Sequence, residues 1–203
     1  MNRSLATLFL APVAAVSLSG CGVNSIPTAE EQAKAKWADV QAAYQRRANL
    51  IPNLVATTKG AAASENQILT GVTQARANAT RITLSGDQLT DPEAMKRFQD
   101  AQNQLSAAIL PLQRLQENYP DLKSQANFQT LMSQLEGTEN RINISIRDYN
   151  EAVQSYNTTI RTFPAVIGAK VIYGAKPMAT YQATTPNADQ APTVDFGTGN
   201  SGG

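Results

Sequence analysis

Residues 128–163, FQTLMSQLEGTENRINISIRDYNEAVQSYNTTIRTF, decide the fold. In this stretch, side chains that are almost all apolar recur at steps of three and four residues, which is the period of one face of an α-helix. That face consists of Phe128, Leu131, Leu135, Thr138, Ile142, Ile146, Tyr149, Val153, Tyr156, Ile160 and Phe163. We therefore predict one long helix from about residue 124 to residue 162. Pro164 ends it, because the residue before a proline is disfavoured in the helical conformation.

A second stripe with the same period lies between Thr28 and Ile82. Thr28 and Glu31 have the spacing of a capping box, so we expect this helix to begin at Thr28. Pro52 cannot donate a backbone hydrogen bond, which predicts a kink or a break at that point. Gly60 is a second weak point, because glycine destabilises a helix interior.

A third stripe predicts a helix over residues 91–119, with an aspartate cap followed by proline at its start. Three long amphipathic helices joined by short turns can bury their stripes only against one another. We therefore predict an all-α fold, an elongated antiparallel up-and-down bundle of three long helices. A short apolar segment, Ala165–Tyr173, is expected to add a helical cap, with a strand as the alternative. The bundle domain would span residues 28–175, and the Thr/Pro/Gly-rich tail 176–203 would be disordered.

The N-terminal residues are typical of a bacterial lipoprotein signal. After a basic residue comes an apolar run, residues 5–18, which is shorter than the ~20 residues that a spanning helix needs. The run ends in Leu18-Ser19-Gly20-Cys21, which has the pattern of a lipobox. We predict a signal peptide over residues 1–20 and a lipidated tether over residues 21–27. The Cys21 thiol would accept diacylglycerol, with acyl chains such as palmitate.

Two alternatives are an ordinary signal peptide and an uncleaved membrane anchor. The short apolar run opposes the anchor, and the position of the single cysteine opposes ordinary cleavage. Gly22, rather than aspartate, follows the cysteine, which in bacterial lipoproteins favours sorting to the outer membrane. We therefore expect a location in the cell envelope, facing away from the cytoplasm, on the periplasmic side of the outer membrane in a two-membrane cell.

The amino-acid composition limits the partners and the reactions that we expect for this chain. The 203 residues include 17 basic and 16 acidic side chains, one cysteine and no histidine. A balanced chain lacks the basic footprint of a nucleic-acid-binding protein, so no nucleic-acid partner is expected. The absence of histidine removes the usual general base and the commonest metal ligand. We predict no cofactor, no metal site, no catalytic residue and no enzymatic activity.

Four segments together resemble the LemA family of bacterial membrane-associated proteins. They are Trp37 with Tyr44-Gln45-Arg46-Arg47-Ala48-Asn49-Leu50-Ile51-Pro52-Asn53-Leu54-Val55; Lys59-Gly60 with Glu65 and Ala75-Arg76; Tyr119-Pro120-Asp121-Leu122-Lys123 with Asn127-Phe128; and Leu135-Glu136-Gly137-Thr138-Glu139-Asn140-Arg141-Ile142 with Arg147-Asp148-Tyr149-Asn150, Val153, Tyr156-Asn157 and Phe163-Pro164. The resemblance implies a helical bundle held at a membrane, and it implies no established biochemical activity. The family often has aspartate at the position of Asn49, and commonly an aromatic residue and a histidine at those of Ala61 and Ser64. A metal or acid–base role at these positions is therefore unsupported in this chain.

One candidate polar cluster joins the first and last helices. Arg47 occupies a seam position, and Glu139 interrupts the last stripe, so Arg46 or Arg47 could pair with Glu139 in an antiparallel core. The best-attested use of such a pair is to fix the register of helices. The alternative is an acid held by an arginine for catalysis, which is the less favoured interpretation because structural networks also perturb charges.

A second candidate is a repeated Tyr-Asn pair. Tyr149-Asn150 and Tyr156-Asn157 are seven residues apart, so they share one side of a helix. Their rings could pack in the seam while their hydroxyls reach water or a neighbouring helix. Alternatively, they form a contact face, a groove for a peptide or a glycan.

Three classes of function remain. We predict a non-catalytic lipid-anchored envelope protein that binds or scaffolds other envelope proteins through its helical faces. The first alternative is a homo-oligomer, in which helices from several chains extend the seams into a structural coiled assembly. The second is an envelope enzyme acting on peptides or peptidoglycan.

Overall fold

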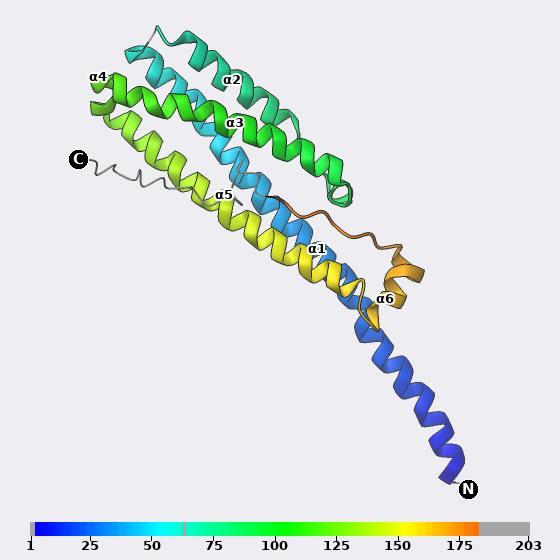
Figure 1. Ribbon diagram of the computed structural model, residues 1–203. Coiled ribbons are helices and arrows are strands. Elements are labelled where there is room, and N and C mark those ends of the chain that lie inside the picture. The colour runs from blue at the N-terminus through cyan, green and yellow to red at the C-terminus, as the bar shows by residue number, and fades with distance from the viewer. Residues whose placement is uncertain (1–2, 63, 183–203) are drawn as a thin grey trace, which may run out of the picture.

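The structure is a computed structural model that describes residues 3–62 and 64–182, with side chains described from Asn24 onward except that of Ala61 (Figure 1). Every regular element in this part of the chain is helical. The elements are α1 (Arg3–Ala61), α2 (Asn66–Arg81), the 3-10 helix η1 (Gly86–Thr90), α3 (Pro92–Asn118), α4 (Pro120–Ser124), α5 (Ala126–Thr159), α6 (Ala165–Gly168) and the π-helical turn η2 (Ala169–Tyr173).

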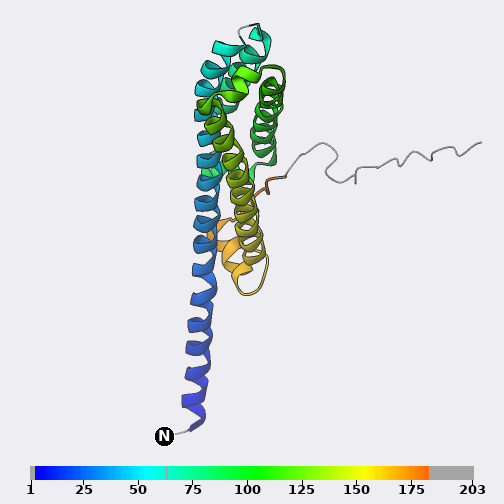
Figure 2. The same ribbon diagram turned by 90° about the vertical axis from the view of Figure 1, so that its left-hand side faces the viewer.

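The long helices run alternately up and down along one axis. Helices α1 and α5 pack against each other over most of the length of α5, and α2 and α3 form a shorter antiparallel pair beside one end of them (Figures 1 and 2). Helix α4 caps the turn between α3 and α5. The prediction of an elongated all-α bundle with a short C-terminal helical segment is confirmed, with four long helices in place of three.

The extra helix arises because the predicted first helix is broken. The chain remains helical through Pro52, which lies on the exposed side of α1, and the break comes after Ala61, one residue beyond Gly60. Before α2 begins at Asn66, Glu65 N–H donates to Ala62 O. The sequence between Gly60 and Glu65 contains only alanine and serine, which have little apolar surface to bury. Folding back lets the α2 stripe, including Val72, pack against α3 instead of continuing into solvent.

The predicted start at Thr28 is also wrong. Thr28 Oγ1 donates to Asn24 O at 2.9 Å, which is a bond within a continuing helix and not a cap. Ile26 is fully buried, so residues 24–27 belong to the packed bundle and are not a loose tether. The backbone of Cys21 lies in α1, and its side chain is outside the described residues.

The core divides into two apolar clusters along the axis. One lies near the N-terminal half of the bundle part of α1, where Trp37 contacts both Phe98 and Tyr149 with ring centroids 5.1 Å apart. The other lies at the end that carries α2, α4 and the C-terminal half of α3, and it includes Leu54 and Leu112. Along α1, α3 and α5 the change from one cluster to the other falls at the same level. A layer of polar residues occupies that level.

Beyond η2 the chain returns along the bundle as an extended segment, residues 174–182, which we call the strap. Gly174 begins it with φ of 55°, a left-handed conformation that glycine adopts without strain. Met178 and Tyr181 are buried, and Ala179 N–H donates to Leu89 O at 2.8 Å. The strap covers the part of the α1–α5 pair that α2 and α3 do not reach (Figure 1). The predicted disorder is therefore wrong for residues 176–182, and the remainder of the predicted tail is outside the described residues.

Candidate functional site

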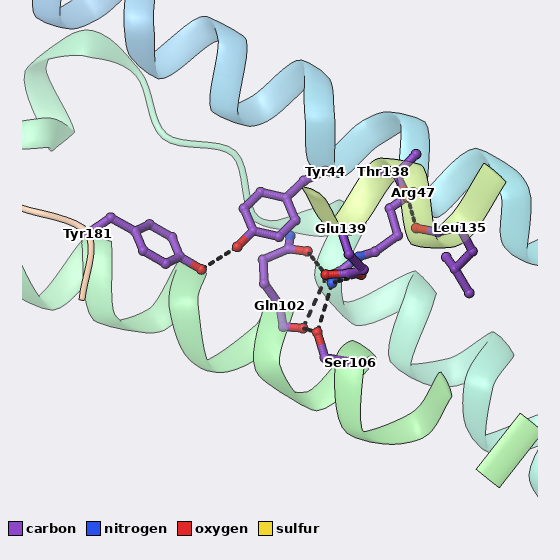
Figure 3. A network of polar contacts seen from close by, with 8 residues as sticks. All are labelled: Tyr44, Arg47, Gln102, Ser106, Leu135, Thr138, Glu139 and Tyr181. Carbon is purple, nitrogen blue, oxygen red and sulfur yellow. Dashed lines mark hydrogen bonds and ion pairs between the residues drawn. The ribbon is translucent and has the colours of Figure 1, made fainter. Parts of the chain in front are cut away.

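Arg47 is the centre of the polar layer between the two apolar clusters (Figure 3). Its side chain is only 1% exposed. Nη1 donates to Ser106 Oγ at 2.7 Å and to Glu139 Oε1 at 3.0 Å, while Nη2 donates to the side-chain and backbone oxygens of Gln102 at 2.9 and 3.2 Å. The guanidinium also lies 4.9 Å from the centre of the Tyr44 ring. Arg47 therefore links α1 to both α3 and α5 at one level.

The geometry of this layer suits a structural role. Among the buried side-chain nitrogen and oxygen atoms of the described residues, only the Nε of Arg47 lacks a hydrogen-bond partner. Glu139 is 43% exposed, so the ion pair reaches the surface and one end of it stays solvated. A register shift along any of the three helices would leave a buried guanidinium without its oxygens, and such a loss is costly. Arg46 does not join this layer; it is exposed and lies on the outer face of α1.

The repeated Tyr-Asn pairs of α5 hold the strap. Each asparagine makes two hydrogen bonds to the backbone of one strap residue. Asn157 bonds the N–H and C=O of Met178, both at 2.9 Å, and Asn150 bonds those of Tyr181, both at 2.8 Å. The two tyrosine hydroxyls donate to strap carbonyls as well. Tyr149 reaches Ala179 O at 2.8 Å and Tyr156 reaches Lys176 O at 3.1 Å.

We call these hydrogen bonds between α5 and the strap the Tyr-Asn ladder. Its spacing follows from the geometry of a helix and an extended chain. Seven residues of α-helix rise about 10.5 Å, and three residues of extended chain span about 10 Å. The heptad on α5 therefore matches a three-residue repeat on the strap, which runs antiparallel to it. The ladder contacts backbone groups, and it leaves Met178 and Tyr181, three residues apart, as the strap's buried side chains. The predicted contact face thus has an occupant, and that occupant is an extended peptide of the same chain.

Burial changes the acidity of the tyrosines around the strap. It raises the pKa of Tyr149 and Tyr156, because a phenolate would lose its hydration there. Burial raises the pKa of Tyr44 and Tyr181 also, and in Tyr44 the neighbouring Tyr181 adds to the effect. The hydroxyls of Tyr44 and Tyr181 are 2.5 Å apart, so the strap is fastened to α1 as well as to α5.

The outer face of the α1–α5 pair carries an open groove of about 470 Å³. Its lining combines small residues, among them Ala42 and Gly137, with the polar side chains of Arg46, Arg141 and Asn140. Ile144 projects beside it and is 44% exposed. Asp39 is the acidic residue in the lining, and it lies near Lys36, whose Nζ is 3.9 Å away. Neither Arg46 nor Arg141 forms an ion pair with a described carboxylate, so the groove presents two uncompensated positive charges beside an apolar side chain.

Two kinds of feature are absent from the described part of the chain. No three His, Cys, Asp or Glu side chains come together there as ligands for a metal ion. Among its helices, none combines the length and apolar character that crossing a bilayer requires.

The sequence reasoning missed the strap and the groove. The signal for the strap was present as two large apolar residues, Met178 and Tyr181, three apart in an otherwise polar segment. The groove had no such signal, because Arg141 and Ile144 lie outside the apolar stripe of α5 and resemble ordinary surface residues.

Fold and site together define an elongated four-helix bundle whose buried polar groups hold helices and a peptide strap in register. The chain belongs to the LemA family, whose sequence profile matches residues 36–196. It is similar to the magnetosome protein MamQ 2 of Paramagnetospirillum magneticum, with 28% identity over 70% of this chain and 58% of that protein. The magnetosome protein MamQ of Magnetospirillum gryphiswaldense is 27% identical over 79% of this chain and 65% of that protein. Protein LemA of Metamycoplasma hominis is 28% identical over 61% of this chain and 52% of that protein. The matches therefore span about half to two thirds of the length of these relatives.

Proposed function

We propose that this chain is a non-catalytic, lipid-anchored envelope protein that docks other envelope proteins on the outer face of its α1–α5 pair. Cys21 carries the anchor, and the bundle faces away from the cytoplasm. In a two-membrane cell it is held on the periplasmic side of the outer membrane. The groove lined by Ile144 carries the docking part of the proposal, because an exposed apolar side chain lies there beside two arginines that form no ion pair with a described carboxylate.

The groove fits a partner of definite chemistry. The small residues in its lining let a helix or an extended segment approach the backbones of α1 and α5 closely. Arg46 and Arg141 would pair with carboxylates of that segment, and arginine gives such pairs geometric specificity through its planar fork of donors. Ile144 would supply apolar contact, which provides more of the binding energy than rim charges do.

The experiment is in-cell crosslinking from the groove. A photoreactive amino acid at Ile144 is expected to capture a distinct envelope protein. The double variant Arg46→Glu/Arg141→Glu is expected to reduce that product at least tenfold, since both charge pairs become repulsive. A matched control is Arg97→Glu/Arg114→Glu, which makes the same change in net charge at exposed arginines of α3. Equal capture in both double variants, or no specific product from Ile144, would reject docking in this groove.

The strap favours a second candidate, self-association. Because the Tyr-Asn ladder bonds mainly to backbone groups, the strap of another copy fits it as well as the chain's own strap does. Gly174 stands where a swapped strap would have to diverge. Light scattering on the mature chain with Cys21→Ser distinguishes the candidates. A monomer supports docking of other proteins. A dimer supports exchange of the strap between two copies, provided that Asn150→Ala/Asn157→Ala dissociates it.

A further inference from the structure

A cluster of exposed apolar side chains lies at one end of the bundle. Phe163 is 81% exposed and Val171 is 79% exposed, and the cluster also includes Ile167, Ile172 and Tyr173. These five are the majority of the large apolar residues that the described part exposes; the other two, Leu110 and Ile144, stand on separate helices. Contiguous exposed apolar residues on one short segment mark an interaction surface more often than scattered ones do.

We call residues 163–173 the end cap, and this segment packs beside the N-terminal part of the described bundle in α1. Ala165 and Ala169, on the inner side of α6 and η2, pack in the same cluster as Ile26 and Ala33 of α1. Figure 2 shows α6 at the end of the bundle from which the N-terminal part of α1 projects. Cys21 precedes Ile26 by five residues, which is about 8 Å along a helix. If lipid is attached at Cys21, the end cap stands within the width of a headgroup layer from the membrane.

The charge of the end cap matches such a surface. Residues 161–176 contain Arg161, Lys170 and Lys176 and no acidic residue, and all three basic side chains are exposed. In the adjoining part of α1, Glu30 and Glu31 both pair with Lys34, at 2.8 and 3.0 Å. The end cap is therefore apolar and locally basic in a chain whose overall charge is balanced.

We propose that the end cap, residues 163–173 with their basic neighbours, is a second membrane contact that inserts apolar side chains among the headgroups of an anionic bilayer. It binds phospholipid acyl chains through Phe163, Val171 and Ile172, and phosphate groups through Lys170 and Lys176. This arrangement is that of an interfacial anchor, whose strength comes from buried apolar area together with attraction to anionic lipids. With the lipid on Cys21 it fixes the bundle upright, so the α1–α5 groove is presented to the side.

The test uses the mature chain, residues 21–203, carrying Cys21→Ser, so that no lipid contributes. It is mixed with vesicles of phosphatidylcholine with phosphatidylglycerol, or of phosphatidylcholine alone, and floated. We expect co-flotation with the anionic vesicles and about tenfold less with the neutral ones, since each basic residue near the surface contributes to binding. Val171→Asp/Ile172→Asp is expected to lower binding to anionic vesicles by tenfold or more, because both side chains are exposed in solution and lose their insertion.

The matched control is Leu110→Asp, which adds an acid at an exposed apolar position of α3 and should leave flotation unchanged. Circular dichroism checks that all variants remain helical. The proposal is overturned if the chain fails to float with anionic vesicles, or if Val171→Asp/Ile172→Asp floats as well as Leu110→Asp. It is also overturned if the end-cap substitutions dissociate a dimer instead, since a second copy would then cover this surface. The membrane contact of the end cap rests on the proposed lipid anchor only for the orientation of the bundle. A negative flotation result would leave both the lipid on Cys21 and the crosslinks from Ile144 unaffected.

Discussion

Replacing Asn157 with alanine is expected to release part of the strap while leaving the bundle folded. The amide of Asn157 makes two hydrogen bonds to the backbone of Met178, and alanine makes neither. A neutral hydrogen bond contributes about 1 kcal/mol net, so Asn157→Ala should weaken strap docking by about 2 kcal/mol. That is an increase of roughly 30-fold in the local opening constant, because about 1.4 kcal/mol corresponds to a factor of ten.

Amide hydrogen exchange at Met178 measures this opening directly. In the unaltered chain the Met178 N–H donates to Asn157 Oδ1. Its exchange rate should therefore equal the rate of a free peptide multiplied by the equilibrium constant for opening of the strap. In Asn157→Ala we expect its exchange to speed up by roughly 30-fold, with buried amides of α1 and α5 unaffected. Asn143→Ala is the matched control, since Asn143 lies two heptads before Asn157 on α5 and is exposed.

Two results would show that the strap is not held as described. Equal exchange at Met178 in Asn157→Ala and in Asn143→Ala would mean that the ladder does not hold the strap. Exchange at the free-peptide rate in the unaltered chain would mean that the strap is not docked in solution.

Four further changes test other parts of the structure. Arg47→Met should lower the free energy of unfolding by about 2–3 kcal/mol, because it leaves Glu139 and the polar groups of α3 without their donor, and urea denaturation measures this. Glu139→Gln should lower the free energy of unfolding by less, about 1 kcal/mol, because the Glu139 carboxylate is partly exposed and the amide keeps one acceptor. An unchanged melting temperature would contradict a role of Glu139 in fixing the register. Gly137→Ala should raise stability by roughly 0.5–1 kcal/mol, because a Cβ there meets nothing within 4 Å and alanine is the better helix former; a lower melting temperature would contradict this packing. Burial raises the pKa of Tyr44 and Tyr149 above the usual value near 10, so the native state retains protons that the unfolded chain releases. The stability from these tyrosines is present below about pH 10 and lost as pH rises further, which the urea midpoint should follow.

The sequence predicted those features that depend on periodicity and local caps. The stripe from Phe128 to Phe163 gave α5 nearly to its ends, and Asp91 caps α3 by accepting from Glu93 N–H at 2.9 Å, as its position before a proline implied. The pairing of an arginine with Glu139 followed from Arg47 at a seam position and from Glu139, which interrupts the apolar stripe of α5. Which arginine pairs was left open, because neighbouring residues on a helix differ in direction by about 100° and small changes of phase decide between them.

The remaining features depend on tertiary packing. Pro52 does not break α1, since a proline on the exposed side of a long helix can be tolerated when its neighbours Ile51 and Leu54 are held in the core. The break after Ala61 is set by the packing of α2 against α3, which the local sequence does not specify. The Tyr-Asn pairs were recognised as a shared face, but their occupant comes from 20 to 31 residues further along the chain, a separation that periodicity does not connect.

Lipid attachment at Cys21 orients the bundle at the membrane, and the intact mass of the protein extracted from membranes measures it. We predict a single species that begins at Cys21, lacks residues 1–20 and carries the added mass of diacylglycerol with or without a further acyl chain. A species that retains residues 1–20, or one that begins elsewhere with an unmodified cysteine, would contradict the lipid anchor.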